Sequence, residues 1–306
     1  MAPAVVAPVV LSASRATDVP AFYAEWFMNR IRAGFFKWTN PFNPAQVQTV
    51  STANARAIVF WSKHPAGILA HLDELDRRGF RYYFQYTLND YEAEGLEPRL
   101  PPLSARVELF RRLSDRLGPE RVIWRLDPLV LADGLGVPEL LDKAAKLAAL
   151  LAPHARKLVF SFADVEGYPA VKQNLARGGF AAREFARAEM KEFARGLAGI
   201  NRAYGLALAT CAEEADLSAH GVAHNRCVDG ELLARLWPED EALMAFLASG
   251  AARKDKGQRP ACGCIAGKDV GRYRTCPFAC AYCYANGSRA EAERNFRAHR
   301  PEGETL

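Results

Sequence analysis

The chain has 306 residues, of which 50% are hydrophobic and 25% charged. This composition excludes an intrinsically disordered, collagen-like or low-complexity protein, and the formal net charge of +5 is too small to indicate nucleic-acid binding by itself. The sequence has no stretch apolar enough to span a membrane, and its apolar first residues lack the basic region of a signal peptide. We therefore expect a cytoplasmic protein without a membrane partner.

Short apolar runs alternate with helical patterns along most of the chain. The runs predict strands, buried on both faces of a parallel sheet, at residues 5–12, 57–61, 82–87, 122–126, 157–162 and 206–210. Proline and glycine boundary signals place helices at residues 21–33, 67–78, 103–117, 138–151 and 181–204. These units predict an α/β fold, a partial (β/α)6 TIM-like barrel of residues 1–250. Residues 251–306 would form a cysteine-rich extension, packed on the barrel mouth and containing a helix at 288–299.

Polar side chains follow the predicted strands, at the barrel end where functional groups gather. Small polar residues there have an alternative explanation as helix caps, but long side chains do not. Burying several of them at one mouth is costly unless they bind a polar ligand. The candidate cofactor-binding residues are Arg15, Lys63, Gln85, Arg125 and Asp127. Among them we favour Arg15 and Arg125 for ligand binding, with Asp127 as a residue that could simply fix Arg125.

All seven cysteines lie in the last third of the chain. In a reducing compartment such thiols indicate metal binding or catalysis more often than disulfides. Cys276, Cys280 and Cys283 form a C-x3-C-x2-C pattern, and three thiolates on one tight loop can bind three irons of a [4Fe–4S] cluster. The fourth iron would stay open for a ligand. Zinc is the alternative, but structural zinc normally has four protein ligands.

The other cysteines form a second set, Cys211, Cys227, Cys262 and Cys264. Four thiolates can fully ligate a second [4Fe–4S] cluster or a structural zinc ion. Burial as small hydrophobic residues is the simpler alternative. We expect one shared second metal centre and favour iron–sulfur over zinc.

The stretch CPFACAYCYAN at residues 276–286 resembles the cluster loop of radical S-adenosylmethionine (SAM) enzymes, and of spore photoproduct lyase and its relatives in particular. This resemblance implies SAM as a cofactor, an electron donor such as a ferredoxin or flavodoxin, and a barrel fold. The stretches LSASRATDVPAFYAEWFMNRI, FWSKHP and VIWRLDP are similar to the DUF1848 family, which implies no particular substrate. Radical SAM enzymes usually carry this loop near the start of the chain, so its late position implies a permuted layout.

Three functions remain open at this stage. The preferred one is a radical SAM-like enzyme acting on an unknown substrate. The second is an iron–sulfur electron carrier or redox sensor that does not turn over SAM. The third is a zinc-stabilised nucleic-acid-binding module, whose basic residues between Arg253 and Arg274 would contact phosphates. We do not favour the third, because aspartates interrupt the basic run and no aromatic ladder accompanies it.

Overall fold

A parallel sheet forms the centre of the computed structural model, which describes residues 5–41 and 43–306. The eight strands run in the order β10-β9-β8-β7-β6-β5-β2-β11, and each neighbouring pair is parallel. The strands are β2 (Val10–Ala13), β5 (Ala57–Ser62), β6 (Arg81–Thr87), β7 (Val122–Leu129), β8 (Lys157–Phe162), β9 (Ala207–Thr210), β10 (Val222–His224) and β11 (Lys268–Asp269).

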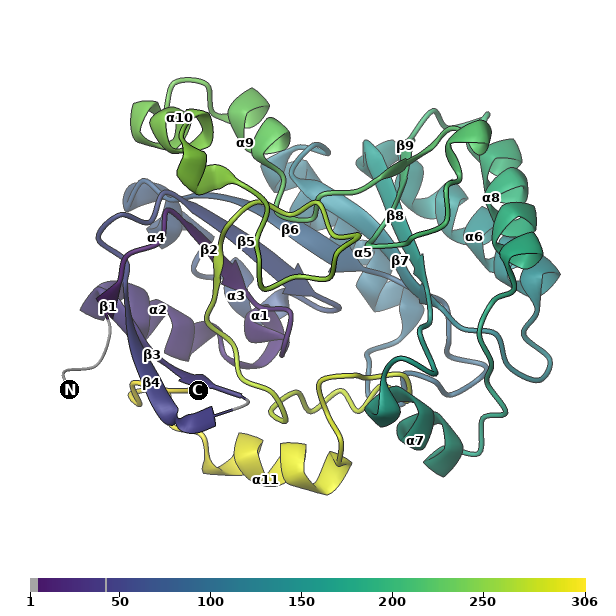
Figure 1. The fold of residues 1–306 in the computed structure, drawn as a ribbon, viewed down its shortest axis with the longest axis horizontal. Helices are drawn as coiled ribbons and strands as arrows, with labels where there is room; N and C mark the ends of the chain where they lie inside the picture. Colours follow the sequence, from purple (N-terminus) through teal and green to yellow (C-terminus); the bar gives the residue numbers. More distant parts are fainter. Residues whose placement is uncertain (1–4, 42) are drawn as a thin grey trace.

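The strand order confirms an α/β fold with an all-parallel sheet. From β2 to β10, neighbours in this sheet follow one another along the chain, whereas a doubly wound sheet would reverse its order. The sequential order is consistent with a partial barrel (Figure 1). The sheet is wider than the six predicted strands, because β10 and β11 extend it at its two edges.

Helices separate the strands and close the molecule at its ends. They are α1 (Val19–Phe22), α2 (Ala24–Ala33), α3 (Ala66–Leu69), α4 (Leu72–Arg77), α5 (Leu103–Leu117), α6 (Val137–Leu151), α7 (Pro169–Arg177), α8 (Arg187–Asn201), α9 (Gly230–Leu236), α10 (Glu241–Ala248) and α11 (Arg289–Ala298). In Figure 1, α9 and α10 lie at the top of the view and α11 at the bottom. None of the helices in the described ranges is both long and apolar enough to cross a bilayer.

One predicted strand has the wrong bounds, and a hairpin was missed. The strand predicted at 5–12 is two strands, because β1 (Val5–Val6) leaves the central sheet and pairs with β4 (Asn43–Ser51). Pro8 lies between β1 and β2, where it cannot donate a ladder hydrogen bond. The antiparallel partner of β4, β3 (Phe35–Asn40), was not predicted.

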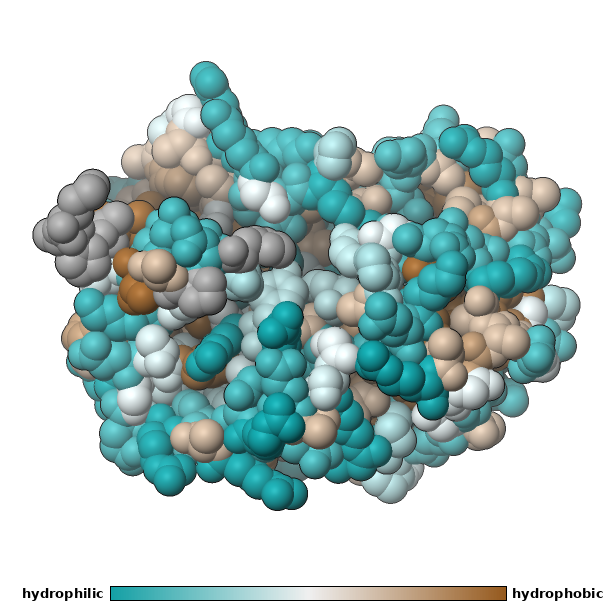
Figure 2. All heavy atoms as spheres, turned by 60° about the horizontal axis from the view of Figure 1, so that its bottom comes forward, coloured by the Kyte–Doolittle hydropathy of each residue, from teal (hydrophilic) through white to brown (hydrophobic). Residues whose placement is uncertain are grey.

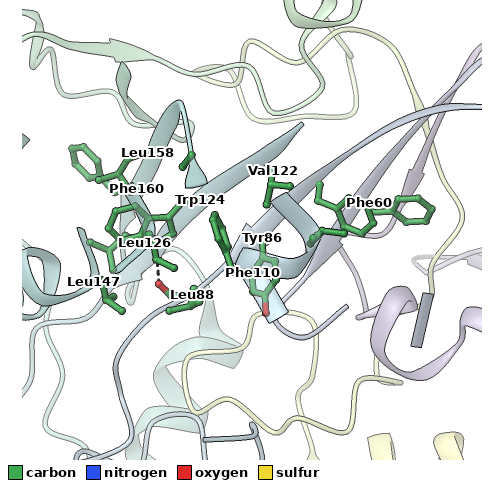
Figure 3. Close-up of a cluster of buried hydrophobic side chains, with 14 of the residues drawn as sticks. Phe60, Tyr86, Leu88, Phe110, Val122, Trp124, Leu126, Leu147, Leu158 and Phe160 are labelled. Atoms are coloured by element: carbon green, nitrogen blue, oxygen red, sulfur yellow. Dashed lines mark hydrogen bonds between the residues drawn. The ribbon is translucent and has the colours of Figure 1, made fainter. Parts of the chain in front are cut away.

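The core lies on both faces of the sheet. On the outer face, aromatic and aliphatic side chains from β5 to β8 pack against the helices (Figure 3), and Trp124 Nε1 donates to the Leu88 carbonyl at 3.1 Å. On the inner face, a second group that includes Val59 and Tyr83 packs against α9 and α10. The alternation follows from the two-residue period of a strand.

Along the inner face, the side chains change from apolar to polar toward the carboxyl ends of the strands. Two residues after Tyr83 comes Gln85, and two residues after Ile123 comes Arg125. Each pair shares a face because strand side chains alternate. Gln85 and Arg125 are nevertheless buried, with 1% and 2% of their surfaces exposed. The inner face therefore carries a buried polar layer above an apolar one.

Residues 251–306 wrap around the sheet and contribute β11 beside β2. Asp269 accepts hydrogen bonds from the Ser12 hydroxyl at 2.9 Å and the Ser14 hydroxyl at 2.6 Å. Near the end of the extension, the Trp26 indole N–H of α2 donates to the Gly303 carbonyl at 3.0 Å. The α11 side of the molecule, which comes forward in Figure 2, is mainly hydrophilic with scattered apolar atoms.

Candidate functional site

The three-cysteine loop, residues 276–283, lies in an irregular segment fixed by side-chain amides. Asn174 of α7 donates to the Cys283 carbonyl at 2.9 Å, and Asn286 donates to the Cys276 carbonyl at 2.8 Å. These bonds hold both ends of the loop, so its conformation depends on α7 as well as on the extension. The sequence did not predict α7.

The sulfur atoms of this loop receive backbone N–H groups. The N–H groups of Asp18 and Phe278 are directed at Cys276, and those two and three residues after Cys283 are directed at its sulfur. Burial still dominates and raises the pKa of Cys276 to about 12. The loop, whose cysteines are half-buried, thus stabilises thiolates only in part, and a bound cation would have to complete that stabilisation.

A cation and a carboxylate lie beside the middle cysteine. Lys63 Nζ donates to Glu97 Oε1 and to the Tyr282 hydroxyl, each at 2.8 Å, and Tyr282 itself donates to Glu97. Burial raises the pKa of Cys280 well above its usual value, and the Lys63 charge works against that rise. Lys63 is therefore the candidate strand-end residue that contacts the three-cysteine loop.

Arg125 organises a second buried network. Its guanidinium donates to Gln85 Oε1 at 3.1 Å, to Asp127 Oδ2 at 3.0 Å and to Cys227 Sγ at 2.9 Å. Burial would raise the pKa of Asp127, but the Arg125 charge holds it below its ordinary value. The structure thus pairs Arg125 with Asp127 and brings Gln85 into the same contact.

Arg15 lies close to this network across a tryptophan. The guanidinium carbons of Arg15 and Arg125 are 4.9 and 5.2 Å from the Trp61 ring centroid. Arg15 also lies against the sulfur of Cys264. Its Nη2 is buried and has no hydrogen-bond partner in the described part of the chain. Both arginines therefore face cysteines outside the three-cysteine loop.

The remaining cysteines, the four-cysteine set of Cys211, Cys227, Cys262 and Cys264, meet on the inner face. The Sγ atoms of Cys211 and Cys227 are 3.4 Å apart, and Cys264 contacts both Cys227 and Cys262. Hydrogen bonding with Cys227, followed by the charge of Arg125, lowers the pKa of Cys211 to about 6. The structure brings these four residues together, although two follow short strands and two lie in the extension.

The chemistry of the three-cysteine loop can be compared with that of a single-ion site. Across residues 5–41 and 43–306, no group of three or more His, Cys, Asp or Glu side chains is arranged to hold a metal ion. A single ion needs ligands that converge on one point, whereas an iron–sulfur cluster takes each thiolate at a separate iron. Soft sulfur donors with N–H groups directed at them therefore fit an iron–sulfur cluster in their chemistry.

Sequence reasoning missed several polar residues of the site. Glu97 is only 6% exposed, yet Glu92 and Glu94 nearby in the sequence look the same and no local pattern separates them. Asn225, whose side-chain amide donates to Cys227 Sγ at 3.1 Å, follows β10, a three-residue strand too short for its pattern to be recognised.

The basic run between residues 253 and 274 is partly engaged by the protein itself. Lys268 Nζ lies 3.3 Å from the Trp38 ring centroid, and Arg272 donates to the Leu306 carbonyl at 2.9 Å. Such contacts leave these two cations less available to a phosphate backbone, so this arrangement offers no additional support for the nucleic-acid alternative.

Comparison with known proteins identifies the family and nothing narrower. No curated protein and no solved structure matches the chain. A family model described as "Domain of unknown function (DUF1848)" matches residues 10–285, a range that contains the three-cysteine loop, the four-cysteine set and all the candidate strand-end residues. The chain therefore belongs to the DUF1848 family, as its sequence patterns predicted.

Proposed function

We propose that this protein is a radical SAM-type enzyme, in which Cys276, Cys280 and Cys283 hold a [4Fe–4S] cluster at the mouth of a partial (β/α)6 TIM-like barrel. The observation that carries the proposal is the half-buried three-cysteine loop, which lies against Lys63 and Glu97 and receives N–H groups at two of its sulfurs. Three thiolates leave one iron without a protein ligand. An enzyme that binds SAM needs such an open iron, whereas an electron carrier does not.

The residues of the chain would prepare this site rather than react themselves. When bound, the cluster would supply the electron that cleaves SAM to a 5′-deoxyadenosyl radical. The N–H groups at Cys276 and Cys283 would stabilise those thiolates, and the Lys63 ammonium would offset negative charge near Cys280. The buried side chains of Phe278 and Tyr282 in the loop would help to keep water away from a reactive radical.

The polar strand ends divide into two groups under this proposal. Lys63, beside the loop, is the residue that we assign to the anionic part of SAM or of the substrate. The N–H donors of Arg125 already contact Gln85, Asp127 and Cys227. We therefore assign the Arg125 guanidinium to positioning these side chains. Arg15, with a donor unused among the described residues, could contact a ligand or a cluster.

Reductive SAM cleavage tests the proposal. Anaerobically reconstituted protein reduced with dithionite should form 5′-deoxyadenosine, and Cys276→Ala, Cys280→Ala and Cys283→Ala should each abolish this product. Tyr284→Phe is the matched control, because it changes a side chain of the same segment whose hydroxyl donates only to the Arg15 carbonyl at 2.7 Å.

The same experiment separates the alternatives. Product formation by any of the three cysteine variants would contradict the proposal. A brown, iron-containing protein that binds an electron but never forms 5′-deoxyadenosine would be an electron carrier or redox sensor. Zinc without iron would indicate the nucleic-acid-binding module. A ferredoxin or flavodoxin that replaces dithionite would identify the class of physiological electron donor.

A further inference from the structure

We propose that Cys211 and Cys227 are a redox-active dithiol, which exchanges electrons with a low-molecular-weight disulfide by forming a disulfide of its own. The Sγ atoms of the two residues are 3.4 Å apart. Since a disulfide has a sulfur–sulfur distance of about 2.05 Å, the two sulfurs need to approach each other by about 1.4 Å. The pair lies outside the three-cysteine loop, and its chemistry does not depend on the function proposed for that loop.

The backbone at both members of the pair is held by the sheet. The Cys211 N–H donates to the Phe160 carbonyl of β8 at 2.8 Å. The Cys227 carbonyl accepts the Tyr83 hydroxyl at 2.6 Å and the Gln85 side-chain amide at 2.9 Å. Because both backbones are fixed with the sulfurs in contact, a disulfide can form and break without rearrangement of the fold.

The two thiols differ in their access to solvent. Cys211 is half-buried, whereas Cys227 is buried with 2% of its surface exposed. A disulfide compound in solution can therefore reach Cys211 first. Ala212, directly after Cys211, has a φ of +54°, which is uncommon for a residue with a Cβ atom. Backbone conformations of this kind gather at functional sites, and this one lies next to the more accessible thiol.

N–H donors contact both sulfurs of the pair. Arg125 Nη1 donates to Cys227 Sγ at 2.9 Å, and Asn225 Nδ2 donates to the same atom at 3.1 Å. The Arg125 guanidinium also contacts the Cys211 sulfur. Its pairing with Asp127 uses other donors than Nη1 and holds the guanidinium in place. Because the thiolate is the reacting form of cysteine, a guanidinium that contacts both sulfurs favours exchange at either of them.

The contacts among the four-cysteine set favour this pair over a shared metal. They form a row, which runs from Cys211 to Cys227, then to Cys264 and then to Cys262. Four thiolates on one tetrahedral zinc ion would each lie close to the other three. Thiolates at separate irons of a cube would lie farther apart than the first two members of the row do. The positions of these sulfurs therefore do not support the second metal centre that we expected from the sequence.

The exchange takes place in two steps. The Cys211 thiol gives up its proton and attacks one sulfur of a substrate disulfide RS–SR, whose S–S bond breaks, and the first RS⁻ takes up that proton. The Cys227 thiol then gives up its proton and attacks the Cys211 sulfur of the mixed disulfide, and the second RS⁻ leaves with this proton. Two electrons pass from the protein to the substrate, and two RSH molecules are formed. A dithiol reductant reverses both steps.

Oxidised glutathione, added to the reduced full chain without oxygen, tests the proposal. Alkylation of the remaining thiols and peptide mass spectrometry should show a disulfide between Cys211 and Cys227 in the wild-type protein, and dithiothreitol should return both thiols. Cys227→Ser should instead accumulate one glutathione on Cys211, because the thiol that would displace it is absent. Cys211→Ser should take up no glutathione on Cys227, because that residue is buried.

Cys262→Ser is the matched control, because Cys262 contacts Cys264 at the far end of the row, and it should form the same disulfide as the wild type. A Cys211–Cys227 pair that stays reduced in excess oxidised glutathione would overturn the proposal. So would glutathione found on Cys227 in place of Cys211, or one zinc ion per chain that protects the set from alkylation. If a variant does not fold, the disulfide map of the wild-type protein still decides.

A second measurement tests the N–H donors through the reduction potential. Asn225→Ala removes one donor from Cys227 Sγ. Stabilising the reduced form of a dithiol raises its reduction potential, so the variant should form the disulfide more readily. A tenfold change in the equilibrium with glutathione would correspond to a potential about 30 mV lower. Asn29→Ala, in α2, is the matched control, since its amide donates to the Pro301 carbonyl. An unchanged potential in Asn225→Ala would overturn the assignment of this donor to the redox pair.

Discussion

Asp269 should be the residue through which the extension is most firmly attached to the sheet. Its Oδ2 accepts the Ser12 hydroxyl at 2.9 Å and the Arg15 N–H at 2.8 Å. Its Oδ1 accepts the Ser14 hydroxyl at 2.6 Å and the Gly271 N–H at 2.9 Å. Asp269→Ala would remove all four acceptor contacts at once while leaving the backbone pairing of β11 with β2.

The size of the effect follows from which donors lose their acceptor. The serine hydroxyls can rotate to other acceptors, but the two backbone N–H groups cannot. An unsatisfied buried donor costs about 1–3 kcal/mol. Since this region is partly accessible to solvent, we expect Asp269→Ala to lower the free energy of unfolding by about 3 kcal/mol. Asp269→Asn, which replaces one acceptor oxygen by a donor, should have an intermediate effect.

Urea unfolding and limited proteolysis would measure this loss. The matched control is Asp255→Ala in the same segment. The half-buried Asp255 side chain accepts the Gly257 N–H at 2.9 Å, in an exposed hydrogen bond, and the Gln258 amide at 3.4 Å, so its removal should cost less than about 1 kcal/mol. Asp269→Ala should also expose residues 253–274 to protease before the sheet unfolds. A cost no larger than that of the control would refute the view that Asp269 fastens the extension.

Three further predictions concern the stability of the folded protein. Gly271→Ala should lower the melting temperature, because a Cβ atom there would lie 1.9 Å from Ser14 Oγ; an unchanged melting temperature would argue against this close packing. Lys63→Met should cost about 2 kcal/mol in urea unfolding, because it removes a charged hydrogen bond from buried Glu97, whereas no loss would show that the remaining partners suffice. Burial raises the pKa of Glu213 from its usual 4.5 to about 7, so the folded protein binds the extra proton and its stability should fall as the pH rises from about 4.5 through 7. Glu213→Gln should flatten this pH dependence of the unfolding free energy, and an identical slope in the variant would exclude Glu213 as its source.

The central sheet could be predicted because its strands are continuous apolar runs. All six predicted strand regions contain strands, and α5 has the predicted bounds. The hairpin of β3 and β4 was missed because β3 is mostly half-buried and has no apolar run. The helix predicted at 21–33 is divided at Tyr23, whose hydroxyl donates to the Thr275 carbonyl. Because this contact of Tyr23 is with the distant extension, the local sequence does not indicate that the helix is divided there.

The candidate site could be predicted only where its residues are close together in the sequence. Cysteine spacing is local, so the three-cysteine loop could be found without a structure, and the four-cysteine set could be proposed as the remainder. The division of the strand-end residues could not be predicted, because it depends on which segment covers each strand. Lys63 contacts Tyr282 and Arg125 contacts Cys227, and both partners come from later parts of the chain.

The pairing of β2 with β11 has a consequence for how the protein is made. Ser12 and Asp269, which face each other across this edge, are 257 residues apart in sequence. During synthesis one edge of β2 therefore stays unpaired until nearly the whole chain has left the ribosome. Such an edge can pair with a strand of another chain. Contacts this distant also slow folding. The nascent protein should therefore depend on chaperones until the ribosome has released the extension.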